Sequence, residues 1–86
     1  MAVLVDAAVW PWRGELWAHL VSDTSYDELH AFADRLGVPR RAFQGDHYDI
    51  PARLCPRAVE LGAEQVRARE LVGRLRQAGL RRPKGR

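Results

Sequence analysis

Eighty-six residues, 47% of them hydrophobic, suffice for one small core and leave no room for a second. Cys55 is the only cysteine, which excludes an internal disulfide and a thiolate zinc site and fits a reducing compartment. No stretch approaches the ~20 apolar residues of a membrane helix and no signal peptide is recognisable, so we expect a cytoplasmic domain that contacts no membrane.

The net charge of +3 is unevenly distributed along the chain. Residues 1–49 carry four basic and eight acidic side chains, a net −4, whereas residues 50–86 carry ten basic and three acidic ones, a net +7. Such a basic half can bind nucleic acid or another anionic partner. It can equally form a solvated helix and tail, and both interpretations stay open.

The first half begins with two expected strands. Residues 2–5 predict a buried strand that ends at Asp6, where folds of strands and helices often place functional groups. Proline and glycine predict a loop over residues 10–14. Residues 16–21 predict a second strand, which is apolar on both faces and therefore central. One of its faces carries Trp17, His19 and Val21.

The first helix has the clearest signals. Ser25 and Glu28 match a capping box, in which each side chain accepts a hydrogen bond from the other residue's backbone N–H. Gly37 fits the left-handed position after the helix, and Pro39 prevents the helix from resuming. Four apolar residues recur at helical spacing between these signals: Leu29, Phe32, Ala33 and Leu36.

Shorter elements follow the first helix. Residues 40–46 are interpreted as a connection, and residues 47–50 as a short extended segment or turn. Pro56 suits the first residue of a second helix that ends at Gly62, because proline lacks the N–H that would be unpaired there. Residues 64–66 fit a brief edge strand.

An amphipathic last helix over residues 68–78 precedes Gly79, and residues 81–86 are expected to be a basic disordered tail. The apolar side of this helix consists of Ala68, Leu71, Val72, Leu75 and Ala78, and its arginines are Arg67, Arg69, Arg74 and Arg76. Together the elements predict one α+β domain over residues 1–80, with a small mixed sheet of three or four short strands packed by two or three helices.

Four motifs stand out along the chain: the opening Val3-Leu4-Val5-Asp6, residues 18–23 leading into residues 27–33, the helix exit Leu36-Gly37-Val38, and His47-Tyr48-Asp49. In this order and spacing they resemble a family of small bacterial and phage proteins catalogued as domain of unknown function 4031. The resemblance covers most of residues 1–80 and implies no particular activity.

The resemblance implies that nine polar residues occupy signature positions of the family, and their types suit chemistry or the binding of small polar ligands. In one respect the chain departs from the family, whose members carry an arginine shortly after the strand-end aspartate. Here the nearest arginine after Asp6 is Arg13, which either takes over that role or leaves it unfilled. The nine residues are Asp6, His19, Asp23, Glu28, His30, Gln44, His47, Tyr48 and Asp49.

The residue types themselves indicate a polar pocket. His47 and Asp49 point to one face if their segment is extended. With Asp6 and either His19 or His30 they form either a mixed site for a divalent metal or a metal-free pocket in which a carboxylate orients a histidine base. Both alternatives stay open, and a His-x-Asp pair is also a common coincidence. The candidate catalytic residues are His47, Asp49, Asp6 and His19.

Ligand-binding side chains are expected beside these residues. Guanidinium groups bind phosphate bidentately, and Arg41 is a better candidate than Arg40 because it lies closer to Gln44 and His47. His30 either contacts the ligand or merely covers the buried side of its helix. The candidate ligand-binding residues are Tyr48, Gln44, Arg41 and His30.

Two functions are consistent with these residues. The leading hypothesis is a small enzyme or ligand-binding domain that acts on a nucleotide-like or phosphorylated small molecule. The alternative is a nucleic-acid or protein-binding module that uses the arginine-rich last helix and tail. Trp10, Trp12 or Phe43 would then stack on bases, although no known nucleic-acid-binding motif is present. Cys55 is interpreted as a core residue.

Overall fold

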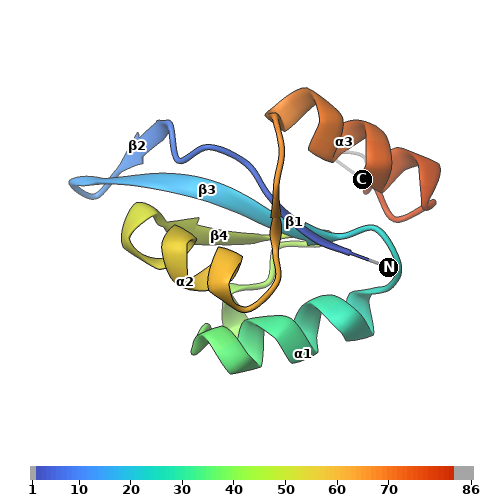
Figure 1. Cartoon of the computed structure of the whole chain (residues 1–86), viewed down its shortest axis with the longest axis horizontal. Helices are drawn as coiled ribbons and strands as arrows, with labels where there is room; N and C mark the ends of the chain where they lie inside the picture. The colour runs from blue at the N-terminus through green and yellow to red at the C-terminus, as the bar shows by residue number, and fades with distance from the viewer. Residues whose placement is uncertain (1, 83–86) are drawn as a thin grey trace.

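The longest strand, β3 (Glu15–Ser22), lies at the centre of a mixed five-stranded sheet in the computed structural model, which describes residues 2–82 (Figure 1). β1 (Val3–Val5) and β2 (Trp10–Trp12) pair antiparallel with opposite ends of β3, and β4 (Tyr48–Pro51) pairs antiparallel with its middle. The partners of β4 overlap those of both β1 and β2. These two strands therefore share one edge of β3, and β4 takes the other.

β5 (Glu64–Gln65) pairs parallel with β1 and completes the sheet. Helices cover both faces of this sheet. The helices are α1 (Tyr26–Leu36), α2 (Cys55–Glu60) and α3 (Ala68–Gln77), with 3-10 turns η1 (Arg40–Ala42) and η2 (Ala52–Leu54). α1 and α2 pack on one face, and α3 packs on the other (Figure 1). The predicted α+β class is confirmed, with five strands in the described chain instead of three or four.

The additional strand is β2, which lies in the segment predicted to be a loop. Trp12 pairs with Glu15, so only two residues connect β2 to β3. Both of them, Arg13 and Gly14, have positive φ (50° and 77°), as a tight hairpin turn of this kind requires. Pro11 is tolerated because β2 lies at the edge of the sheet. The loop prediction was wrong because Pro11 and Gly14 were interpreted as breaking a strand.

Two apolar clusters lie on opposite faces of the sheet. The larger one joins β1, β3 and β4 to α1 and α2 and includes Leu20, Leu29 and Ile50, none of which has exposed surface. The smaller one joins Leu4 and Val21 to two leucines of α3, Leu71 and Leu75. Burying a side chain of this size contributes about 1.5–3 kcal/mol, so most of the hydrophobic stabilisation lies on the α1 face.

The start of α1 differs in one respect from the expected capping box. The Ser25 hydroxyl accepts a hydrogen bond from the Glu28 backbone N–H at 3.0 Å, as predicted. The Glu28 carboxylate instead accepts from the Ser22 hydroxyl, and Ser22 in turn accepts from the Ser25 N–H. Ser22 thus links the end of β3 to the start of α1. Gly37 ends the helix with φ 86°, as predicted.

The later elements lie close to their predicted positions. α2 includes Pro56 in its first turn and ends at Glu60, two residues before Gly62. β5 and α3 fall within the segments assigned to an edge strand and a last helix. Of the segment expected to be a disordered tail, Arg81 and Arg82 contact folded residues, and residues 83–86 lie outside the described part. Within residues 2–82, no helix is long and apolar enough to cross a membrane.

Candidate metal centre

Four polar side chains from three strand segments meet on the face of the sheet that α3 covers. Asp6 directly follows β1, His19 lies within β3, and Asp49 of β4 lies opposite His19. His47 precedes β4 and shares a face with Asp49, because side chains alternate along an extended chain. The structure therefore brings together the four residues taken as catalytic candidates.

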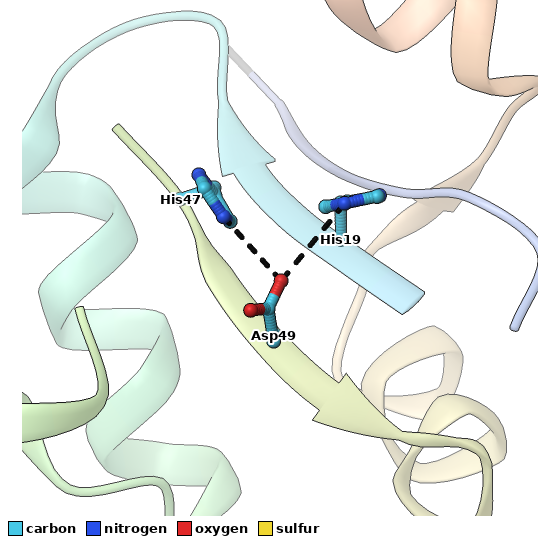
Figure 2. Close-up of side chains that lie close together, drawn as sticks. All are labelled: His19, His47 and Asp49. Carbon is cyan, nitrogen blue, oxygen red and sulfur yellow. Dashed lines mark ion pairs between the residues drawn. The ribbon is translucent and has the colours of Figure 1, made fainter. Parts of the chain in front are cut away.

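Three of these side chains direct an atom to a common point. The Oδ1 atom of Asp49 lies 3.4 Å from Nε2 of His47 and 3.9 Å from Nε2 of His19 (Figure 2). All three ligand atoms lie within 4.8 Å of one another. Each side chain is half-buried, so the point between them is shielded and still accessible.

The other ring nitrogen of His19 is held by a buried carboxylate. Asp6 Oδ2 lies 2.8 Å from His19 Nδ1, and Asp6 Oδ1 accepts a hydrogen bond from the His19 backbone N–H at 2.7 Å. The Asp6 side chain is only 4% exposed. Because the carboxylate accepts a hydrogen bond from Nδ1–H, the Nε2 atom of the neutral ring carries a lone pair directed at the common point.

His47 is held in the same way by a residue that the sequence did not indicate. Asp46 Oδ1 lies 2.7 Å from His47 Nδ1, and its side chain is 4% exposed. The other oxygen, Oδ2, accepts from the Arg82 backbone N–H at 2.8 Å and lies 3.5 Å from Nη1 of Arg81. Both histidines therefore have the outer carboxylate partner that metal-ligating histidines commonly use.

Asp49 has one carboxylate oxygen with a hydrogen-bond partner and one without. Its Oδ2 atom accepts a hydrogen bond from the Gln44 side chain at 3.0 Å. Its Oδ1 atom is buried and accepts no hydrogen bond. A buried, unpaired carboxylate oxygen is unfavourable by several kcal/mol. The oxygen faces two nitrogen lone pairs, so only a proton or a cation between them removes the repulsion.

Protonation of His47 is one way to satisfy this oxygen. Asp49 raises the pKa of His47 above its ordinary value, with Asp46 adding to the rise and burial opposing it. Burial alone would raise the pKa of Asp46, but hydrogen bonds from Arg82 and His47 lower it. Asp46 thus remains a carboxylate that orients His47 in either state of the ring.

A divalent cation bound between His19, His47 and Asp49 is the other way to satisfy this oxygen, and the three ligand atoms suit such an ion. Two imidazole nitrogens and one carboxylate oxygen suit zinc, manganese, iron or nickel. Three protein ligands leave coordination positions open, as catalytic metal sites require. The buried, unpaired Oδ1 atom of Asp49 is the observation in this protein that favours such an ion.

A cavity of about 380 Å³ opens beside these ligands. One wall is polar and contains the five residues of the paired histidines and carboxylates: Asp6, His19, Asp46, His47 and Asp49. The opposite wall is apolar and comes from α3, through Leu71, Val72 and Leu75. Trp10 and Arg81 also line the cavity. The site therefore combines candidate metal ligands, an aromatic ring, a guanidinium group and an apolar cover.

Tyr48 and His30 lie on the other face of the sheet. Tyr48 follows His47 directly, so strand alternation directs its side chain into the α1 core, where it is 1% exposed. Its hydroxyl is 2.8 Å from Nδ1 of His30. Burial, followed by the charge of Arg40, lowers the pKa of His30. The structure thus corrects the expectation that these two side chains would join the pocket.

The other two predicted ligand-binding residues, Gln44 and Arg41, lie in different places relative to the cavity. Gln44 lines the cavity and contacts Asp49, whereas Arg41 is exposed on η1 and does not line the cavity. Asp23 pairs with Arg74, at 2.6 Å, and stabilises the packing of α3. Asp46 and Arg81 were missed, because only the fold brings these two residues together.

Comparison with known proteins identifies a family and nothing further. The family described as Protein of unknown function (DUF4031) matches residues 3–78. This match confirms the resemblance drawn from the sequence motifs. No curated protein and no solved structure matches the chain.

Proposed function

Because this chain belongs to a family of unknown function, DUF4031, we propose its activity from the geometry of the site. In this proposal, the protein is a small enzyme that hydrolyses a phosphorylated small molecule. It uses a divalent cation held by His19, His47 and Asp49. The observation that carries this proposal is the buried, unpaired Oδ1 atom of Asp49 between two histidines.

The charge of the cavity supports both the cation and an anionic substrate. With neutral histidines, the carboxylates of Asp6, Asp46 and Asp49 and the guanidinium of Arg81 give the cavity wall a net charge of −2. This charge attracts a divalent cation and repels a phosphate. Once the cation binds, the sum is zero, and the cation and Arg81 together can hold a phosphate group.

The residues around the cation have separate tasks in this proposal. A divalent cation supplies Lewis-acid chemistry, which lowers the pKa of water and neutralises phosphate charge. Asp6 and Asp46 hold the two imidazole rings in the tautomer that ligates. Arg81 binds the phosphate oxygens, and the α3 wall restricts access of bulk water.

The proposed reaction is hydrolysis of a phosphate monoester. Water supplies the oxygen of a new P–O bond, and the ester P–O bond breaks. One water proton ends on the departing alcohol, and the other remains on the released phosphate. No oxidant or reductant is involved.

Metal binding to matched histidine variants tests the proposal. We expect the purified protein to bind about one equivalent of zinc or manganese by elemental mass spectrometry and calorimetry. The His47→Ala variant should lose at least 90% of it. His30→Gln serves as the control, because His30 lies on the opposite face and Gln keeps a partner for Tyr48.

Metal loading must also produce activity. Phosphate release from a panel of phosphate monoesters should depend on the cation and disappear in His47→Ala. Equal metal binding by wild type and His47→Ala, or no binding after reconstitution, would overturn the metal centre. Metal binding without phosphate release would overturn the hydrolytic reaction alone.

Nucleic-acid binding through α3 is the second candidate. Arg67, Arg69 and Arg76 are exposed on or next to α3, which favours contact with phosphates. Arg74 is a weaker candidate because it already pairs with Asp23 and Glu64. Replacing the three exposed arginines by glutamine should abolish salt-dependent binding to single-stranded DNA. Binding that survives this change would exclude α3 as the contact.

A further inference from the structure

Two buried side-chain polar atoms without a hydrogen-bond partner occur in the described residues, and both belong to residues that line the cavity beside His19, His47 and Asp49. One is Oδ1 of Asp49, which the proposed cation satisfies. The other is the indole Nε1 atom of Trp10, a donor without an acceptor. Buried donors of this kind are rare in native proteins. A ligand in the cavity that carries an acceptor would satisfy the indole as the cation satisfies the carboxylate.

The position of Trp10 relates this ring to the metal ligands. Its ring centroid lies 6.2 Å from that of His19, and the two planes are inclined by 30°. His19 in turn lies 5.4 Å from His47, ring centroid to ring centroid. A planar group lying against Trp10 is therefore next to the cation, within the reach of a phosphate attached to the same small molecule.

Neighbouring tryptophans fix the Trp10 ring in place. Trp17 stacks on it with centroids 6.0 Å apart, and Trp12 packs on Trp17 at 5.5 Å. The Trp17 indole donates a hydrogen bond to the Trp12 carbonyl at 2.8 Å, and Arg13 lies over the Trp12 ring. Trp10 is thus a supported aromatic wall of the cavity, with Trp17 and Trp12 as positioning residues.

We infer that the substrate is a nucleoside monophosphate, whose base lies against Trp10 while its phosphate binds the cation and Arg81. This inference rests on the proposed function and names its substrate class. Every nucleobase offers a π-face on which an aromatic ring can stack and, at its edge, acceptors for an indole N–H; because that N–H lies in the plane of the indole, these are two alternative contacts of a base with Trp10. The cavity volume of about 380 Å³ lies in the range of small-molecule pockets. A sugar phosphate lacks the planar ring that the aromatic wall fits.

Three probes that share a ribose 5-phosphate and carry adenine, uracil or no base test the inference. Adenosine and uridine 5′-monophosphates and ribose 5-phosphate are titrated by calorimetry into the manganese-loaded protein, and phosphate release is measured in parallel. At least one nucleotide should bind at least tenfold more tightly than ribose 5-phosphate, the size of effect expected from stacking on one ring.

Variants of the β2–β3 hairpin test whether Trp10 causes the preference for a nucleotide over ribose 5-phosphate. Trp10→Leu should remove the difference between nucleotide and ribose 5-phosphate and leave ribose 5-phosphate binding unchanged, whereas Trp10→Phe should retain part of it. Leu16→Ala, which shortens an exposed side chain of the same hairpin that does not line the cavity, is the matched control and should retain the preference. Thermal unfolding of each variant verifies that the hairpin change leaves the fold intact.

The outcomes separate this inference from the proposed function. Equal affinity for all probes, no binding of any of them, or a preference that survives in Trp10→Leu would overturn the inference. Equal binding with cation-dependent phosphate release would leave the hydrolase and remove the base subsite. A Trp10-dependent preference without phosphate release would keep the subsite and remove the hydrolytic reaction.

Discussion

The two faces of the sheet use adjacent residues of the same strands for opposite purposes. On the α1 face, Leu20 and Ile50 are fully buried among apolar side chains. On the α3 face, their neighbours His19 and Asp49 line a cavity. The polar pair on the α1 face, Tyr48 and His30, is satisfied by its own hydrogen bond. Both unpaired buried side-chain atoms among residues 2–82 lie on the α3 face.

This difference shows how a domain of 86 residues carries a site without weakening its core. A strand presents alternate residues to opposite faces, so β3 and β4 stabilise the fold on one side and present the candidate metal ligands on the other. α3 covers its face with only a small apolar cluster, which leaves space beside the ligands. Stability and ligand binding should therefore be separable by changing neighbouring residues.

Substitutions of Ile50 and Asp49 should give the largest effects that test whether stability and ligand binding are separable. Ile50→Ala opens a cavity in the α1 core and should lower the free energy of unfolding by about 2–5 kcal/mol. Asp49→Asn removes the buried, unpaired charge and should therefore raise the free energy of unfolding of the metal-free protein by about 1–3 kcal/mol. Urea denaturation with a chelator present measures both values.

Metal binding should show the reverse order for the same two variants. Ile50→Ala should keep the affinity for zinc or manganese under conditions where it is folded, and Asp49→Asn should lose about 100-fold or more. A large destabilisation by Asp49→Asn, or metal loss in folded Ile50→Ala, would mean that the two faces are coupled.

The part of this comparison that the sequence predicts depends on local periodicity. Alternation in residues 16–21 places His19 on one face, and an extended segment at residues 47–50 gives His47 and Asp49 a common face. The signals at Ser25 and Gly37 were also sufficient to predict where α1 begins and ends, because helix capping depends on a few neighbouring residues. Periodicity does not say which segments become neighbours, so the distances between ligand atoms were beyond prediction.

Two features of the site were missed from the sequence, and only the first depends on contacts that no local pattern encodes. Asp46 meets Arg81 and Arg82 across 35 and 36 positions of the chain, and these arginines were assigned to a tail. Tyr48 was placed in the pocket because it lies within the His-Tyr-Asp motif, although the alternation that joins His47 to Asp49 directs Tyr48 to the opposite face. That second error was avoidable from the sequence.

Asp46 offers an intermediate test of the α3 face, because it acts through a ligand. Asp46→Asn keeps the side-chain volume but holds His47 more weakly, so the affinity for zinc or manganese should fall about 10–100-fold, as for other outer partners of metal ligands. Asp34→Asn, at an exposed position of α1, is the control and should have no effect. An unchanged affinity in Asp46→Asn would show that the carboxylate only ties down the segment around Arg82.

The smallest expected effect is the dependence of stability on pH in the metal-free protein. Since folding raises the pKa of His47, its protonated form stabilises the fold fully below the unfolded value of about 6.5. This contribution is lost as the pH rises through the higher folded value. Burial lowers the pKa of His30, which acts in the opposite direction in the same range. The difference between wild type and His47→Gln therefore isolates His47, and it should shrink from about pH 6 to pH 8.

Metal affinity should have the opposite dependence on pH in the same range. A cation takes the place of the proton between His47 and Asp49, so the affinity should increase with pH, by up to about tenfold per unit while one proton is displaced. Asp46 does not interfere, because its lowered pKa places its titration below the ordinary value near 3.8. Calorimetry in buffers of different ionisation enthalpy measures the proton released. Zinc or manganese binding without proton release at pH 6 would mean that His47 is not a ligand, and the α3 face would then have to satisfy Asp49 by protonation alone.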